Sequence, residues 1–302
     1  AWLHTAGPSV ITDELAVHEG RIASLTLQQE GIDPVTGQSV LRPHTLVVGL
    51  YSFDGDGALV RTHRLPVVLE AEQLDIVEAV GLPAPDLVIV NDEDLTYAVV
   101  RPDDTSLSCL AASLGALRDP MARSLTWSML HNLVRDARID AALFVQAVLE
   151  HADDDTEPST LTVLLNQALR VTSRYAGPHT RRALLERLVA DDLTEPSKMT
   201  APAFLHGGWG RLRAAAPGSD AQIVRARAWL EAAGQARLLG EAGSAQAAAR
   251  AREILDGALP GLELDADMRW RALTALAQLD AVSADELEAQ RKADPTASGI
   301  TH

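Results

Sequence analysis

The sequence predicts an α+β protein with more than one domain, in which a small N-terminal β-sandwich precedes an all-α superhelix of the HEAT or armadillo type. Short β-rich runs separated by turn residues fill the first third of the chain. From Thr105 onward, apolar residues recur at helical spacing and no strand signal returns. The predicted helices form pairs that recur at about forty residues, close to the HEAT or armadillo period, although no repeat consensus is legible. We therefore expect a β-sandwich domain at residues 1–103 and a helical solenoid domain at residues 104–302.

The N-terminal third is predicted to contain about seven short strands, which is enough for a small β-sandwich. The turn sequence Asp54-Gly55-Asp56-Gly57 joins two β-rich runs into a hairpin. Pro66, Pro83 and Pro85 interrupt any long helix in this region. The predicted strands lie in a hairpin around His18 and in residues 45–51, 59–60 with 65–69, 87–90 and 97–100.

Capping residues and helix breakers mark the predicted helices. Asp119 and Pro120 are an N-cap and a first-turn proline, and Ser219 with Gln222 fits a capping box. Glycine and proline breakers recur between the helices. The expected helices cover residues 107–117, a segment from 120 past 133, and residues 140–151, 159–175, 180–191, 202–216, 219–233, 245–259, 265–279 and 283–292. A helical bundle is the alternative that this rhythm leaves open.

Composition argues against several classes of function. The chain has 302 residues, and its 42 acidic residues outnumber its 26 lysines and arginines, which gives a net charge of −16. Phosphate binding needs a basic face, so we expect no nucleic-acid partner. No run of about eighteen apolar residues exists, so we expect no membrane partner. The single Cys109 fits a reducing compartment, and we expect a cytoplasmic protein.

The pair His18-Glu19 opens a zinc-peptidase signature but does not complete it. In H-E-x-x-H, the two histidines share one helical face and bind zinc while the glutamate acts as base. Ile22 occupies the second histidine position, and Gly20 with the alternating apolar pattern favours an exposed hairpin turn. No two histidines of the chain have the spacing of a local zinc site. The nine histidines are His4, His18, His44, His63, His131, His151, His179, His206 and His302.

The acidic loops are predicted to be turns or solvated segments. Residues 54–57 resemble the start of a calcium loop, but the twelfth position is Leu65 instead of glutamate. Residues 91–94 and 153–155 are short acidic runs between elements, where a solvated loop is the usual explanation and a weak divalent-cation site the alternative.

The other candidate residues also favour structural roles. Cys109 lies among apolar residues of a predicted helix, so we expect a buried, inert thiol. Residues 205–210 contain glycines suited to an oxyanion loop, but they lie among helices without a nucleophile, and a bent or broken helix is the preferred explanation. His131 and Asp136 are placed on different faces of a helix by their spacing. We predict no catalytic, cofactor-binding or metal-ligating residue in this chain.

Four parts of the sequence resemble the C-terminal half of actinobacterial aminopeptidase N. The resemblance spans nearly the whole chain, and its most specific stretch runs from Asn91 to Tyr97. The matching stretches are residues 2–7 (WLHTAG), 41–44 (LRPH) with 49–51 (GLY), 85–98 (PDLVIVNDEDLTYA) and 217–222 (PGSDAQ).

The resemblance implies a noncatalytic C-terminal part of a zinc-dependent aminopeptidase. In that family a zinc-binding catalytic domain precedes this region, so zinc belongs to the full-length enzyme and none of its ligands to this chain. The helical domain is implied to cap the active site and shape the peptide-access chamber. The implied partners are the upstream catalytic domain of the same polypeptide and peptide substrates at the concave helical face.

Other hypotheses stay open at this point. A standalone α-solenoid that binds another protein, without peptidase activity, has the same helical pattern, and an enzyme with an unrecognised site is a third class. The chain starts at Ala1 and stops without a polar capping helix. We therefore expect the natural protein to extend at both ends, with the helical domain truncated at its C-terminus.

Overall fold

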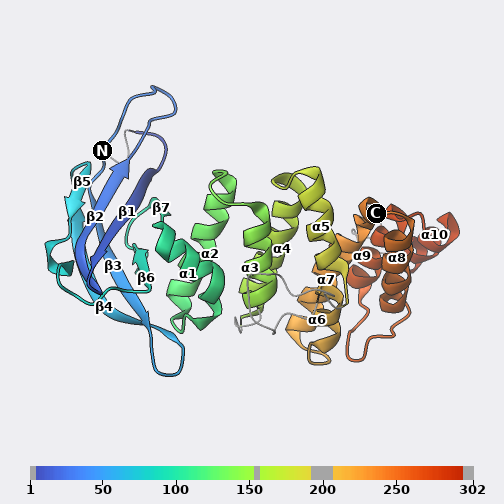
Figure 1. Cartoon of the computed structure of the whole chain (residues 1–302). Coiled ribbons are helices and arrows are strands. Elements are labelled where there is room, and N and C mark those ends of the chain that lie inside the picture. Colours follow the sequence, from blue (N-terminus) through green and yellow to red (C-terminus); the bar gives the residue numbers. More distant parts are fainter. Residues whose placement is uncertain (1–4, 153–156, 192–206, 295–302) are drawn as a thin grey trace. The chain divides into compact units, whose positions relative to one another are not determined.

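The structure is a computed structural model that describes residues 5–152, 157–191 and 207–294 (Figure 1). Strands precede helices along the chain, which confirms the predicted α+β layout with a helical C-terminal region. Contacts divide the chain into two compact units, residues 1–139 and 140–302. Unit 1 contains β1 (Ser9–His18), β2 (Arg21–Glu30), β3 (His44–Phe53), β4 (Leu59–Leu69), β5 (Gln73–Asp75), η1 (Val77–Ala79), β6 (Leu87–Val90), β7 (Ala98–Arg101), α1 (Asp104–Ser113), η2 (Leu114–Ala116) and α2 (Pro120–Arg135).

All regular elements in the described part of unit 2 are helices. Its helices are α3 (Ala141–His151), α4 (Pro158–Arg174), α5 (Pro178–Val189), α6 (Gly208–Ala214), α7 (Asp220–Gly234), η4 (Ala236–Leu239), α8 (Glu241–Leu255), α9 (Ala266–Gln278) and α10 (Ala284–Ala293).

Two sheets pack face to face in unit 1. One sheet has the strand order β5-β2-β1-β7 and the other β4-β3-β6. Ile11 and Leu27 from the first sheet share one apolar core with Leu46 and Val88 from the second. The predicted hairpin around His18 is confirmed: Glu19 and Gly20 both have positive φ, 51° and 73°, as the twist of a two-residue hairpin turn requires.

Strand β6 is buried on both faces, which explains its uninterrupted apolar sequence. Val88 belongs to the core between the sheets, whereas Ile89 packs with Leu110 of α1 and Met129 of α2. The backbone N–H of Val88 donates to Oγ of Ser106 in α1 at 2.9 Å. Because α1 and α2 cover the outer face of β6, they belong to the compact unit that contains the sheets.

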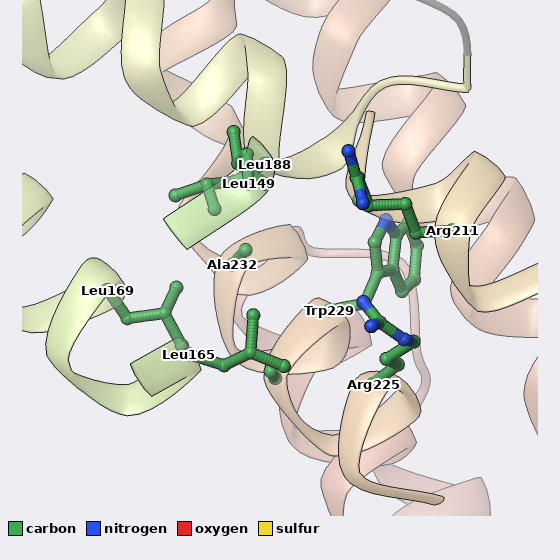
Figure 2. Close-up of a pocket in the computed structure, with 10 residues that line it drawn as sticks. Leu149, Leu165, Leu169, Leu188, Arg211, Arg225, Trp229 and Ala232 are labelled. Carbon is green, nitrogen blue, oxygen red and sulfur yellow. The ribbon is translucent and has the colours of Figure 1, made fainter. Parts of the chain in front are cut away.

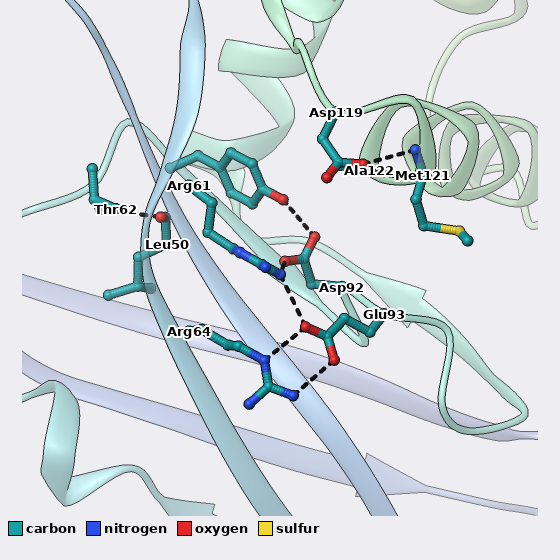
Figure 3. A network of polar contacts seen from close by, with 10 residues as sticks. Leu50, Arg61, Thr62, Arg64, Asp92, Glu93, Asp119, Met121 and Ala122 are labelled. Atoms are coloured by element: carbon teal, nitrogen blue, oxygen red, sulfur yellow. Dashed lines mark hydrogen bonds and ion pairs between the residues drawn. The ribbon is translucent and has the colours of Figure 1, made fainter.

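A buried carboxylate joins three strands of the smaller sheet (Figure 3). Asp92 follows β6, and its side chain is 1% exposed. It accepts hydrogen bonds from the Tyr51 hydroxyl at 2.7 Å and from the Arg61 guanidinium at 2.8 Å. Burial, and next the hydrogen bond to Asp92, raise the pKa of Tyr51 far above its ordinary value. Gly49 leaves room for this carboxylate, since a Cβ there would overlap Asp92.

The prediction of a solvated loop at residues 91–94 is therefore wrong for its first half. Asn91 and Asp92 are both buried. Asn91 has φ 60°, and its side-chain oxygen accepts from the backbone N–H groups of Leu95 at 3.0 Å and Thr96 at 3.2 Å. These hydrogen bonds close the loop on itself, so the polar residues satisfy buried groups instead of facing water.

Helix α7 is central to unit 2. It packs against α4, α5, α6, α8 and α9. Trp229 of α7 lies 4.6 Å from Trp209 of α6, measured between ring centroids, and both belong to the apolar core of this unit. Small residues on α7, such as Ala226 and Ala233, let the neighbouring helices approach closely.

The helix predicted at residues 202–216 is observed only from Gly208 to Ala214, and residues 202–206 lie outside the described part. Gly207 is its N-cap and has an extended conformation. The backbone N–H of Gly207 donates to the Asp191 carbonyl at 2.8 Å, and that of Trp209 donates to the Ala190 carbonyl at 2.9 Å. A Cβ at Gly208 would overlap the Leu188 carbonyl oxygen. The glycines thus permit close backbone contact between the start of α6 and the end of α5.

Two other predictions of helix ends need correction. Helix α8 begins at Glu241 and ends at Leu255, four residues earlier at each end than predicted: Gly240, with φ 86°, is its N-cap, and Gly257, with φ 74°, stops it. The capping box at Ser219 is half formed: Ser219 accepts from the Gln222 N–H at 3.2 Å, but the Gln222 side chain accepts from Gly218. The predicted N-cap at Asp119 is confirmed.

Replacing Gly208 with alanine is expected to destabilise unit 2 by about 1–3 kcal/mol, because the new methyl group forces the α5–α6 backbones apart. Urea unfolding followed by tryptophan fluorescence measures the change. Gly177→Ser is the matched control, since Gly177 is an N-cap with open space at the Cβ position. Equal unfolding midpoints for Gly208→Ala and the control would contradict the close contact.

Replacing Asp92 with alanine is expected to destabilise unit 1 by about 3 kcal/mol, because it leaves the buried Tyr51 hydroxyl without its acceptor and leaves Arg61 only its second partner, Glu93 at 3.2 Å. Thermal unfolding measures the loss. Glu93→Gln is the control: Glu93 pairs with the half-exposed Arg64 at 2.7 Å and with Arg61 at 3.2 Å, and its amide can still accept from both, so about 1 kcal/mol at most is lost. A smaller loss for Asp92→Ala than for Glu93→Gln would overturn this assignment.

Candidate functional site

A polar hollow of unit 2 lies along α4, α7 and α9. A hollow of about 440 Å³ is lined by α7, α9 and Gln235, and a second of about 140 Å³ by α4, α7 and Arg271 of α9. Arg227, Glu231 and Arg271 line both hollows, so we treat them as one surface, the α4–α7–α9 groove. Its polar residues are Thr162, Asn166, Arg227, Glu231, Gln235, Asp267, Arg271, Thr274 and Gln278.

Helical spacing places these polar residues in rows. Arg227 and Glu231 are four residues apart on α7, as are Asp267 and Arg271 on α9, so each pair lies on one side of its helix. The opposite sides of α7 and α9 carry the apolar residues of the unit 2 core. Each helix therefore buries one face and presents its polar row to the groove.

One carboxylate holds both arginines of the groove. Asp267 Oδ2 lies 3.0 Å from the Arg227 guanidinium and 3.0 Å from Nε of Arg271. Burial opposes ionisation, but the hydrogen bonds from Arg271 and Arg227 hold the pKa of Asp267 below its ordinary value. Within the described residues, Glu231 makes no ion pair, although it lines both hollows. The groove thus contains two cations and two anions. Among them, Glu231 is the charged side chain that is not in an ion pair within the described residues.

The groove also offers uncharged hydrogen-bonding groups. Asn166, Gln235 and Gln278 each carry an amide that can donate and accept, and Thr162 and Thr274 carry hydroxyls. Gly234 makes room for Gln278, because a Cβ at Gly234 would overlap the amide oxygen of Gln278. This set of groups can bind a polar chain through hydrogen bonds.

A second pocket of unit 2 is too small for an organic ligand (Figure 2). Its volume is about 30 Å³, which is room for about one water molecule. Leucines such as Leu149 and Leu169 form one side, and Arg211, Arg225 and Trp229 form the other. Burial lowers the pKa of Arg225 to about 10. We interpret this pocket as a gap in helix packing.

None of the sequence candidates that the structure describes lines the groove. His18 and Glu19 lie in the exposed β1–β2 turn, and Ile22 is buried at 2% exposure, which confirms the hairpin-turn interpretation. Asp54 accepts from the backbone N–H groups of Asp56 at 3.0 Å and Ala58 at 2.8 Å, so residues 54–57 are a hairpin turn as predicted. Asp153, Asp154, Asp155 and His206 lie outside the described residues.

The remaining candidates have structural surroundings. Cys109 packs beside the core between β6, α1 and α2, and burial raises the pKa of its thiol to about 11. Asp136 pairs with Arg101 at 2.9 Å. Within the ranges that the structure describes, no three His, Cys, Asp or Glu side chains are grouped so that they could hold a metal ion.

Sequence reasoning missed the groove residues. Their four-residue spacing on α7 and α9 was a legible signal of polar helix faces. No local signal indicates that α4, α7 and α9 become neighbours, because other helices separate them in the chain.

Among the described residues, no helix has the length and apolar content needed to cross a membrane.

Comparisons with known proteins identify the family of the chain. Residues 87–301 match the family model described as the ERAP1-like C-terminal domain. The whole chain is similar to Aminopeptidase N of Streptomyces lividans, with 31% identity over 308 residues, and spans 33% of that protein's length. The resemblance to the C-terminal region of an aminopeptidase N, which the motifs at residues 85–98 and 217–222 indicate, is thereby confirmed. Because the family model covers more than half of it, this chain belongs to the ERAP1-like C-terminal domain family.

Proposed function

We propose that this chain is the noncatalytic C-terminal part of a zinc-dependent aminopeptidase, in which the helical region caps the active site and shapes the peptide-access chamber. The observation that carries the proposal is the similarity of the whole chain to 33% of an Aminopeptidase N. The match to a family model described as a C-terminal domain supports it. The proposed partner is the upstream catalytic domain of the same polypeptide, and the proposed location is the cytoplasm.

Zinc belongs to the upstream domain in this proposal. A catalytic zinc site needs three protein ligands, and the described residues offer no such group of side chains. His18 and Glu19 do not replace it, since they lie in an exposed turn with Ile22 buried beneath them. The residues of this chain contribute binding and shape, and no step of peptide hydrolysis is assigned to them.

The α4–α7–α9 groove is the proposed peptide-facing surface of the helical region. A peptide main chain presents one N–H and one C=O per residue, and the amides of Asn166, Gln235 and Gln278 can pair with both. Because Asp267 already pairs with Arg227 and Arg271, the Glu231 carboxylate is left to attract ammonium or guanidinium groups of a peptide. In this proposal the groove belongs to the concave face of a HEAT-type superhelix, the kind of surface that such repeat proteins use for binding.

The purified chain is expected to release no product from an aminoacyl anilide and to hold no stoichiometric zinc, because the catalytic residues lie in the upstream domain. The assay measures turnover and counts zinc in the same sample. A separately expressed zinc domain is expected to bind the chain. Turnover with stoichiometric zinc would mean that this chain has its own site, and absence of binding to the zinc domain would favour a standalone scaffold.

In the full-length enzyme, Glu231→Gln is expected to lower kcat/KM for peptides with cationic side chains by about 2–5-fold, the effect of one exposed charge pair. Cleavage of a short aminoacyl anilide should stay unchanged, since it does not reach the groove. Glu263→Gln is the control, because Glu263 is also exposed but lines neither hollow of the groove. Equal effects on cationic and neutral peptides would argue against steering by Glu231.

A further inference from the structure

Two carboxyl groups meet inside unit 1, far from the groove residues in the sequence. Asp13 lies in β1, and β7 runs parallel to β1 with Thr12 opposite Arg101. This register brings Asp103, which follows β7, beside Asp13, so that the two carboxyl groups are close enough to affect each other's ionisation. Asp103 is also the N-cap of α1. The contact therefore joins the sheet to the first helix.

Asp13 has surroundings that disfavour a charge. It is 7% exposed, and neither carboxyl oxygen makes a well-aligned hydrogen bond with a donor of the described residues; the backbone N–H groups of Asp103 and Asp13 stabilise its charge only weakly. Its neighbour in register on β2 is Leu27, which is fully buried. An ionised carboxylate buried without donors is strongly unfavourable, so a protonated Asp13 is favoured here.

Asp103 has surroundings that favour a charge. Its Oδ1 accepts from the backbone N–H groups of Thr105 at 2.7 Å and Ser106 at 3.0 Å. Its Oδ2 accepts from the Ser106 hydroxyl at 2.7 Å. The N-terminal end of a helix also stabilises a negative charge. Of the two carboxyl groups, Asp103 is the one that stays ionised.

The pKa directions agree with these surroundings. Burial, and next the hydrogen bond and charge of Asp103, raise the pKa of Asp13 well above its ordinary value, while weaker backbone hydrogen bonds oppose the shift. Burial opposes ionisation of Asp103, but the hydrogen bonds from Ser106 and Thr105 hold the pKa of that carboxyl below its usual range.

Other charged groups near Asp13 and Asp103 either form an ion pair with another residue or are exposed to solvent. Arg101 of β7 pairs with Asp136 at 2.9 Å. Glu14 alternates to the opposite side of β1 and is exposed, and Asp104 in the first turn of α1 is also exposed. The residues of β6 are all apolar. Asp103 is therefore the charged group that faces Asp13 within the described residues.

We infer that Asp13 carries a proton at neutral pH and donates it to the Asp103 carboxylate, so that one shared proton fastens β1 to the N-terminus of α1. Between the unfolded and folded pKa of Asp13, the unfolded chain has lost this proton and the folded chain keeps it. The unfolding equilibrium constant therefore rises by up to about tenfold per pH unit in this window. Above the folded pKa, the buried Asp13 carboxylate faces the partly buried Asp103 carboxylate, and the contact between β1 and α1 opens.

The protonation state can be observed directly in the whole chain with ¹³C-labelled aspartate. One side-chain carbonyl resonance is expected to stay in the position of a neutral carboxyl at pH 7 and to be absent from Asp13→Asn. If all aspartate resonances have reached the ionised position at pH 7, the inference is overturned. The wild-type spectrum alone decides this point, even if the variant does not fold.

Unfolding as a function of pH is the second measurement. Asp13→Asn supplies an amide N–H donor to Asp103 without a proton to lose. The ratio of the wild-type unfolding constant to that of Asp13→Asn is expected to increase with pH, by up to about tenfold per unit in the window. Asp104→Asn, on the same helix but exposed, is the control and should follow the wild-type profile. Parallel profiles for Asp13→Asn and wild type would also overturn the inference.

Discussion

Burial of α7 against its neighbours is the constraint on which the helical unit depends. The helix packs against α4 on one side and α9 on another, and α6 covers it through the contact of Trp209 with Trp229. Alanines at 226 and 233 keep these distances short. Since most of its circumference is used for packing, the remaining row that contains Arg227 and Glu231 becomes the floor of the groove. Packing and the candidate binding surface thus arise from one helix.

Burial also determines which polar groups unit 1 can contain. Strand β6 gives one face to the core between the sheets and the other to α1 and α2. A buried polar residue next to this strand needs hydrogen-bonding partners. Asp92 has them, because it accepts hydrogen bonds from Tyr51 and Arg61. Asp13 receives no well-aligned hydrogen bond, and we infer that a proton satisfies it. The two buried carboxyl groups of this sandwich therefore have different partners, protein donors at Asp92 and the inferred proton at Asp13.

Conformational constraint on the backbone explains a motif that otherwise suggests chemistry. The glycines at 207 and 208 resemble part of an oxyanion loop by composition, yet they serve close contact with Ala190 and Leu188 at the end of α5. Glu19 and Gly20 likewise satisfy the geometry of a hairpin turn. Neither motif is needed for catalysis in a chain whose proposed role is to cover and shape a site formed elsewhere in the polypeptide.

The sequence by itself determined the order of strands and helices, the turns at Glu19-Gly20 and Asp54-Gly57, and the N-cap at Asp119, because each depends on residues a few positions apart. Motifs at residues 85–98 and 217–222 also indicated the family. Only the tertiary structure decided that the acidic loop buries Asp92, that Gly208 starts a helix against α5, and that Arg227, Asp267 and Arg271 meet. Those outcomes depend on contacts between segments far apart in the chain, where the space left by one element fixes the conformation and charge of another.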